Sequence, residues 1–148
     1  MEEAAVLAED VSFMNTHGTA TVYNDEMESK AIHLAGLETV PVHSLKSYFG
    51  HTLGASGVIE SIICIHELKE NVLFGTLGYE KPGVSMPILV QADHQEIPMK
   101  HCIKTASGFG GCNAAIVLTL PAYQKQPSRV QSSVTVHTTA TVSIENSC

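Results

Sequence analysis

An apolar helix expected over residues 57–70 constrains the fold of this chain more than any other segment. Apolar side chains and one histidine cover most of its circumference, namely Val58, Ile59, Ile62, Ile63, Ile65, His66 and Leu68. Its charged side chains are limited to Glu60, Glu67, Lys69 and Glu70. A helix that is apolar nearly all round is typical of a buried helix. The small residues of Gly54–Gly57 before it let its N-terminal end approach other backbone closely.

Short apolar segments on both sides of this helix predict strands. We expect strands at Val11–Asn15, Ile88–Gln91, Cys102–Ser107 and Ala114–Leu120, and a short extended piece at Val40–His43. The last strand is continuously apolar, which is typical of a strand covered on both faces. The end of a helix is expected over residues 2–9, and a full helix runs from Asn24 to about Leu34 and stops at Gly36. Strands alternating with helices predict a layered α/β unit.

Composition and charge exclude several classes of protein. The chain has 148 residues and a formal net charge of −7, so it forms about one domain and has no basic surface for nucleic acid. No apolar run approaches the roughly 18 residues that a membrane span needs. The N-terminus is acidic and carries no secretory signal, so we expect a cytoplasmic protein with free thiols. Residues 97–148 hold four basic side chains and one acidic side chain, and are the only part able to attract an acidic partner.

Cysteine and histidine spacing predicts no metal site. The four cysteines form no C-x-x-C pair, and no two of the eight histidines stand in an H-E-x-x-H context. Cys64 and Cys102 are expected to be core thiols, and Cys148 a terminal, exposed one.

The end of the chain differs in composition from the rest. From Gln124 onward Ser, Thr, Gln and Val predominate. Residues 134–142 alternate weakly and are compatible with an edge strand, but a polar segment of this kind buries little apolar surface, which favours a flexible tail. We therefore expect a domain over residues 1–121 and a tail over residues 122–148.

Three glycine-rich segments each join an element to a turn, beginning at Asn15, Lys46 and Ser107. Such turns at the ends of buried elements commonly present catalytic groups. His17 and His51, each next to a glycine, can donate an N–H to a developing oxyanion or act as acid and base. Taken singly, each histidine is better explained as a turn or core histidine bonded to backbone, and Lys46 as a solvated lysine. Phosphate binding by these turns is a weaker hypothesis, because no P-loop or G-x-G-x-x-G motif is present.

The three segments, in this order, resemble the C-terminal half of a β-ketoacyl-acyl-carrier-protein synthase, a condensing enzyme with the thiolase-like layered fold. The family patterns are H-G-T-G-T-x-x-N-D, K-x-x-x-G-H-x-x-G-A-x-G-x-x-E and G-F-G-G-x-N. The chain reads HGTATVYND from His17, KSYFGHTLGASGVIE from Lys46 and GFGGCN from Gly108. Ala20 and Ser56 are the departures, and each exchanges one small residue for another. The resemblance extends over about residues 1–120.

The resemblance implies a role for each matching residue. His17 and His51 match the histidines that drive decarboxylation of carrier-bound malonate and hold the enolate oxygen. Lys46 matches the supporting lysine, and Glu60 the buried acid that orders its surroundings. The other matches are two threonines that bind the phosphopantetheine arm, a gating aromatic that completes the oxyanion hole, and two structural polar positions: Thr19, Thr21, Phe109, Asp25 and Asn113.

The same resemblance implies decarboxylative Claisen condensation in fatty-acid or polyketide synthesis, with no bound cofactor and with substrates carried on the phosphopantetheine of acyl carrier protein. In the family the nucleophile is a cysteine in the N-terminal half, and none of the four cysteines here matches it. Cys112 fills only the variable position of its motif. We therefore expect the chain to act with an N-terminal synthase half. The alternatives are a non-catalytic scaffold or chain-length-type subunit beside a complete synthase, and an inactive truncated product. Alone, the chain should not condense acyl groups, and apolar surface should be exposed where another half would pack.

Overall fold

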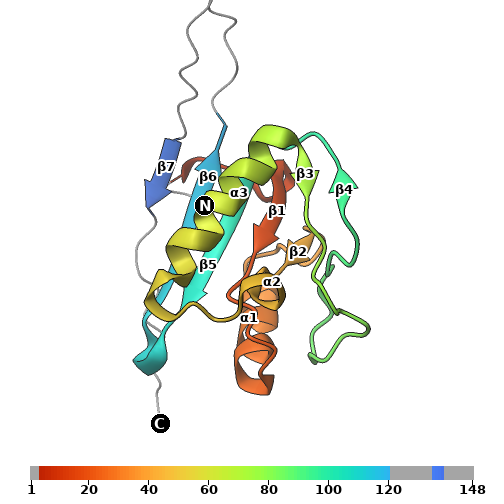
Figure 1. The fold of residues 1–148 in the computed structure, drawn as a ribbon, viewed down its shortest axis with the longest axis vertical. Helices are drawn as coiled ribbons and strands as arrows, with labels where there is room; N and C mark the ends of the chain where they lie inside the picture. Colours follow the sequence, from red (N-terminus) through yellow and green to blue (C-terminus); the bar gives the residue numbers. More distant parts are fainter. Residues whose placement is uncertain (1–3, 121–134, 139–148) are drawn as a thin grey trace, which may run out of the picture.

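The computed structural model describes residues 4–120 and 135–138 (Figure 1). Its α-helices are α1 (Val22–Leu34), α2 (Lys46–Phe49) and α3 (Ser56–Glu70), and its 3-10 helices are η2 (Ala8–Asp10), η3 (Leu53–Ala55) and η4 (Phe109–Gly111). Its strands are β1 (Val11–Asn15), β2 (Val42–His43), β3 (Val72–Leu73), β4 (Gln95–Glu96), β5 (His101–Ser107), β6 (Asn113–Thr119) and β7 (Thr135–Thr138). The described part of the chain is therefore a mixed α/β unit, as the sequence predicts.

The main sheet has the strand order β2-β1-β5-β6-β7. The pairs β1–β2 and β1–β5 are parallel, whereas β5–β6 and β6–β7 are antiparallel. Strands β3 and β4 form a separate antiparallel pair. The parallel strands β2, β1 and β5 consequently end at one edge of the sheet.

Two apolar cores lie on opposite faces of the sheet. On one face Ile32 of α1 packs with Val11, Ile103 and Val117. On the other face Leu68 of α3 packs against a set that includes Phe13, Cys64, Cys102 and Leu118. Successive strand residues point to opposite faces, which explains why Ile103 and Cys102 belong to different cores. Figure 1 shows α3 lying across the sheet in front of β5.

Helix α3 differs from the fully buried helix that its sequence predicts. Val58 and Ile62 are 64% and 51% exposed, whereas the carboxylate residues Glu60 and Glu67 are 3% and 1% exposed. The helix buries the face that carries its acids because they meet polar partners in the sheet, described below. Its opposite apolar face is left open, in agreement with the expectation of exposed apolar surface.

Several local predictions are confirmed. Strand β1 has the predicted bounds, β5 begins one residue earlier than predicted, and β6 is shifted by one residue. Helix α1 ends before Gly36, whose φ of 68° turns the chain so that the following Leu37 N–H donates to the Ile32 carbonyl at 3.0 Å, in a left-handed helix end.

Other local predictions are wrong. Residues 8–10 form a single 3-10 turn rather than the end of an α-helix. Helix α1 is capped at Thr21 instead of Asn24, because the Asn24 amide turns inward to donate to Glu28. The segment Ile88–Gln91 contributes one bridge, Val90 to Val42, and no strand. Only Val117 and Leu118 of β6 are buried, so this strand is not covered along its length.

The sequence favours a flexible tail over residues 122–148 and leaves residues 134–142 compatible with an edge strand. Within that range the backbone of Thr135–Thr138 pairs with β6 as the edge strand β7, because β6 leaves one side open for pairing. The other predictions for residues 122–148 lie outside the described residues. Among the residues that the structure describes, no helix is long and apolar enough to cross a membrane.

Candidate active site

The sheet brings the three glycine-rich segments to one edge. His17 follows β1, Lys46 and His51 follow β2, and Phe109 follows β5. Because these three strands are parallel, their carboxyl ends are neighbours, and this edge is where α/β sheets commonly bind ligands.

His17 and His51 lie side by side at this edge. Their ring centroids are 5.0 Å apart and the rings meet edge to face at 84°. His17 is buried and His51 is exposed. At this separation, both imidazoles can contact the same small group when it binds on the solvent side of the two rings.

Glu28 of α1 fixes the loop that carries His17. Its carboxylate accepts the backbone N–H groups of His17 at 2.8 Å and of Gly18 at 2.7 Å. It also accepts the Thr105 hydroxyl at 2.8 Å and the Asn24 amide at 2.9 Å. Sequence reasoning missed Glu28, because it lies outside the quoted motif. Its spacing of eleven residues from His17 gives no local signal.

The electrostatic surroundings keep His17 neutral. Burial lowers the pKa of His17 below 6.5, and the nearby cations Lys46 and Lys104 lower it further against the opposing effect of Glu28. The Nδ1 atom of His17 is buried and has no hydrogen-bond partner among the described residues. The ring is therefore a neutral imidazole whose hydrogen bonds are not all used within the protein.

The tautomer of His51 follows from its backbone contact. The Leu53 N–H donates to the His51 carbonyl at 2.5 Å and is also within 3.2 Å of Nδ1 of His51. In the neutral ring the proton then resides on Nε2, which leaves an N–H donor facing away from the backbone. A neutral His51 in this arrangement is a donor for an oxygen that acquires negative charge.

Lys46 and Glu60, both predicted site residues, form a buried ion pair at 2.6 Å. A second lysine that sequence reasoning missed, Lys104 of β5, binds the other Glu60 oxygen at 2.7 Å and is 2% exposed. Burial lowers the pKa of Lys104, and Glu60 opposes this effect. Lys104 is thus interior, so it is not part of a basic docking surface as its position in the C-terminal third suggested. Its role could not be predicted from the sequence, because Lys104 stands in a strand segment, CIKTAS, that matches no motif.

The remaining predicted residues fall into two groups. Thr19, Thr21 and Asp25 line a cleft of about 670 Å³ together with Lys46 and His51. The hydroxyls of Thr19 and Thr21 lie 2.8 Å apart, and both threonines keep some exposure. Phe109 is fully exposed and does not line the cleft, and Asn113 begins β6 opposite Ser107. The structure therefore brings Thr19, Thr21 and Asp25 to the site but not Phe109.

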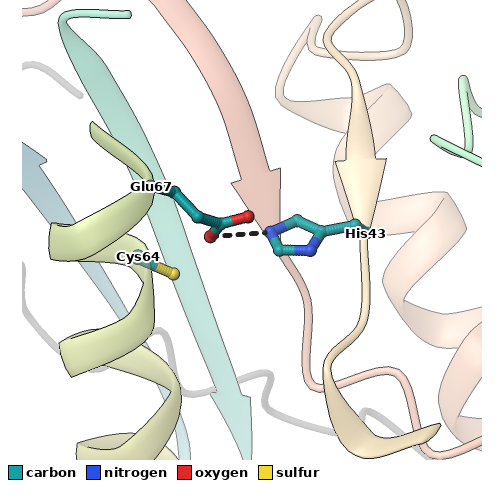
Figure 2. Close-up of side chains that lie close together, drawn as sticks. All are labelled: His43, Cys64 and Glu67. Atoms are coloured by element: carbon teal, nitrogen blue, oxygen red, sulfur yellow. Dashed lines mark ion pairs between the residues drawn. The ribbon is translucent and has the colours of Figure 1, made fainter. Parts of the chain in front are cut away.

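A second polar cluster adjoins the site, and one of its residues, His43, also lines the cleft. Nε2 of His43 is 3.4 Å from a carboxylate oxygen of Glu67, and Cys64 lies on the same helix one turn earlier (Figure 2). Burial raises the pKa of Glu67 to about 8 and lowers the pKa of His43 to about 3. Without another bound group, the two side chains are therefore mostly uncharged near pH 7. Sequence reasoning missed this cluster, because its residues come from β2 and α3 and match no motif.

Comparison with known proteins decides the family. The model of the beta-ketoacyl synthase C-terminal domain matches residues 1–80, which is more than half of the chain. The chain belongs to the β-ketoacyl synthase family. It is 34% identical over 122 residues to 3-oxoacyl-[acyl-carrier-protein] synthase 2 of Vibrio harveyi, covering 79% of the chain and 29% of the relative. It is 30% identical over 118 residues to the polyketide biosynthesis malonyl-ACP decarboxylase PksF of Bacillus subtilis (strain 168), covering 80% of the chain and 28% of the relative.

Solved ketosynthase structures share the thiolase-like fold with this synthase domain. One is a type II polyketide synthase acyl-carrier protein in complex with its ketosynthase bound to the hexaketide. It matches with a TM-score of 0.72 and 29% identity, over 80% of the chain and 30% of the matched chain. The synthase domain described here spans less than a third of the length of these relatives.

Proposed function

We propose that this chain supplies the histidine half of a condensing site that decarboxylates carrier-bound malonate and stabilises the resulting enolate. The observation that carries the proposal is the pairing of His17 and His51 at a ring separation of 5.0 Å on the ligand-binding edge of the sheet.

The chemistry of decarboxylation fits two neutral imidazoles. Loss of CO2 moves the electrons of the broken C–C bond into the thioester, so that negative charge collects on the thioester oxygen. Donors already aimed at that oxygen stabilise the charge without reorganisation, and one such donor contributes roughly 10²–10³ in rate. His51 offers Nε2–H, and His17 is kept neutral by burial and by the lysines. The Lys46–Glu60–Lys104 group holds the surroundings of both rings in place.

The proposed site also needs a nucleophilic cysteine and a place for the carrier-bound substrate. The nucleophilic cysteine that accepts the acyl group is supplied by a segment outside these 148 residues, as expected from the family. The exposed apolar face of α3, with Val58 and Ile62, is where that segment packs. The cleft beside Thr19 and Thr21 receives the phosphopantetheine arm of acyl carrier protein. Location in the cytoplasm stays a prediction from the sequence.

Decarboxylation without condensation is a second candidate, because the two histidines lie together while none of the four cysteines matches the family's nucleophile. One relative is named a malonyl-ACP decarboxylase. A scaffold or chain-length-type role explains the site less well, because a scaffold has no need of paired histidines held by buried charges.

The test measures CO2 release and product formation from malonyl-acyl carrier protein. The full chain is assayed alone and after co-expression with the N-terminal two thirds of a related synthase. We expect CO2 release that falls at least about 10²-fold in His17→Ala and in His51→Ala. His33→Ala is the control, because His33 lies on α1 away from the cleft. Condensed product that appears only with the added segment supports a split site, and acetyl-carrier without condensed product supports the decarboxylase. Folded protein that releases no CO2 in either preparation contradicts both.

A further inference from the structure

A second chemically distinct site lies inside the protein, between β2 and α3. The imidazole of His43, the thiol of Cys64 and the carboxylate of Glu67 each offer an atom that can bind a metal, and these three atoms all lie within 4.8 Å of one another. Each residue is at most 1% exposed. Figure 2 shows the His43 ring and the Glu67 carboxylate pointing toward each other, with the Cys64 sulfur on the same side of α3.

The spacing of two of these atoms suits two ligands of one ion better than a hydrogen bond. His43 Nε2 and Glu67 Oε2 are 3.4 Å apart. Protein N–H···O hydrogen bonds are shorter, with a most common length of about 2.9–3.0 Å. Two atoms bound to one tetrahedral zinc at about 2.0–2.1 Å are separated by about 3.3 Å. The observed distance therefore fits shared coordination.

Polar atoms in and beside this cluster leave hydrogen-bonding capacity unused. Among the described residues, Glu67 Oε2, His43 Nδ1 and Asn15 Oδ1 are buried and have no hydrogen-bond partner, and the Asn15 amide nitrogen lies 3.4 Å from His43 Nε2. Leaving a buried polar group without a partner costs roughly 1–3 kcal/mol. The other Glu67 oxygen accepts the Phe74 N–H at 2.9 Å, which directs Oε2 toward His43. Such an outer contact is typical of carboxylates that are oriented toward a metal.

We propose that His43, Cys64 and Glu67 bind one zinc-type divalent cation that fastens α3 to β2. The thiolate and the carboxylate together carry two negative charges, which a divalent ion neutralises in this dry core. On binding, the ion displaces the protons of the thiol and of the protonated carboxyl, and both leave to solvent. A thiolate ligand selects zinc or cobalt over magnesium and calcium.

The proposed ion links the interior to the active-site loop without taking part in its chemistry. The backbone carbonyl of His43 accepts the N–H of Thr16 at 3.0 Å, immediately before His17. Fixing His43 thus fixes the start of the His17 loop. Because the three ligands are closed off from solvent, the ion enters as the chain folds, and binding is coupled to stability. This inference does not depend on the proposed function.

The experiment uses the full chain, unfolded and refolded without metal and then with Co²⁺ or Zn²⁺. We expect one metal per chain by elemental analysis and a thiolate-to-cobalt charge-transfer band. The variant Cys64→Ala should lose the band, and Glu67→Gln should weaken binding by at least about tenfold. Cys112→Ala is the matched control, since the Cys112 thiol is exposed.

A second measurement is thermal stability. Zn²⁺ should raise the melting temperature of the parent chain and not that of Cys64→Ala.

Either of two results overturns the inference. One is a parent chain that refolds fully and takes up no stoichiometric Co²⁺ or Zn²⁺. The other is a charge-transfer band that survives in Cys64→Ala and disappears in Cys112→Ala. Circular dichroism of each variant shows whether it is folded. If a variant is not folded, metal uptake by the parent chain alone tests the inference.

Discussion

Glu28 accepts the two backbone N–H groups that flank the α-carbon of His17, those of His17 and of Gly18. Its two oxygens accept the two successive N–H groups at 2.8 and 2.7 Å. The position of the candidate catalytic residue His17 therefore depends on a carboxylate in α1, eleven residues further along the chain.

The variant Glu28→Gln should loosen the His17 loop. Each Glu28 oxygen accepts two hydrogen bonds, one of them from a backbone N–H, so the glutamine NH2 group at either position leaves a backbone N–H without its charged acceptor. We expect the free energy of unfolding to fall by about 1.5–3 kcal/mol, measured by urea denaturation. Glu38→Gln, at an exposed position, is the control. Equal stability of both variants would show that Glu28 does not hold the loop.

Gly18→Ala should be more destabilising than Gly36→Ala. Gly18 has a φ of +42°, and a Cβ there would lie 2.6 Å from the Cβ of Ser44. Gly36 has a φ of +68° with open space around it. The left-handed backbone alone costs an alanine about 1–2 kcal/mol, and overpacking adds about 1–3 kcal/mol at Gly18 only. Thermal unfolding of the two variants compares these costs, and a smaller loss for Gly18→Ala would contradict the packing.

Removing the Lys46 charge should raise the pKa of His17. Burial is the largest cause of the lowered value, and Lys46 is the next, so Lys46→Met returns the pKa only part of the way toward 6.5. Ring proton shifts followed by NMR across the acidic range give this pKa directly. Lys30→Met removes an exposed charge on α1 and should leave it unchanged. A His17 pKa that falls in Lys46→Met would refute the assigned electrostatics.

The metal-free chain should lose stability as pH rises toward and through 8. Burial raises the pKa of Glu67 from 4.5 to about 8, so between these values the folded chain holds a proton that the unfolded chain has released. The stabilisation is complete below the unfolded pKa and disappears as pH passes the folded one. Glu67→Gln should remove this part of the pH dependence. Urea unfolding with a chelator at about pH 5.5 and about pH 8 measures the difference, and equal slopes for the two proteins would exclude Glu67 as the cause.

The open face of α3 should make the isolated chain self-associate. Replacing Val58 and Ile62 with Gln adds polar surface at exposed positions, so we expect less association at nearly unchanged stability. Sedimentation velocity of the parent and the double variant measures association. A parent chain that is already monodisperse and monomeric would argue against a packing surface on this face.

Local patterns predict the elements of this fold well, and contacts between distant segments explain the differences. The apolar run at β1 and the glycine at the end of α1 are read from neighbours in sequence. Which face of α3 is buried cannot be predicted from neighbours in sequence. Glu60 is buried because it pairs with Lys46, fourteen residues before it, and with Lys104 in the distant strand β5.

The candidate site follows the same division. The motifs identify His17, His51, Lys46 and Glu60, which the sheet brings together at one edge. They do not identify Glu28, whose role depends on how α1 folds back onto the loop after β1. Phe109 shows the reverse case, because its motif matches the family while its side chain is exposed away from the cleft.

The most direct test of the central claim is a double-mutant cycle on CO2 release, using the chain reconstituted with the complementary synthase segment. If His17 and His51 stabilise one oxyanion together, the double alanine variant should lose little more activity than either single variant, because residues that act as a unit are strongly non-additive. Losses that multiply independently, or single variants that retain full activity, would contradict a shared site.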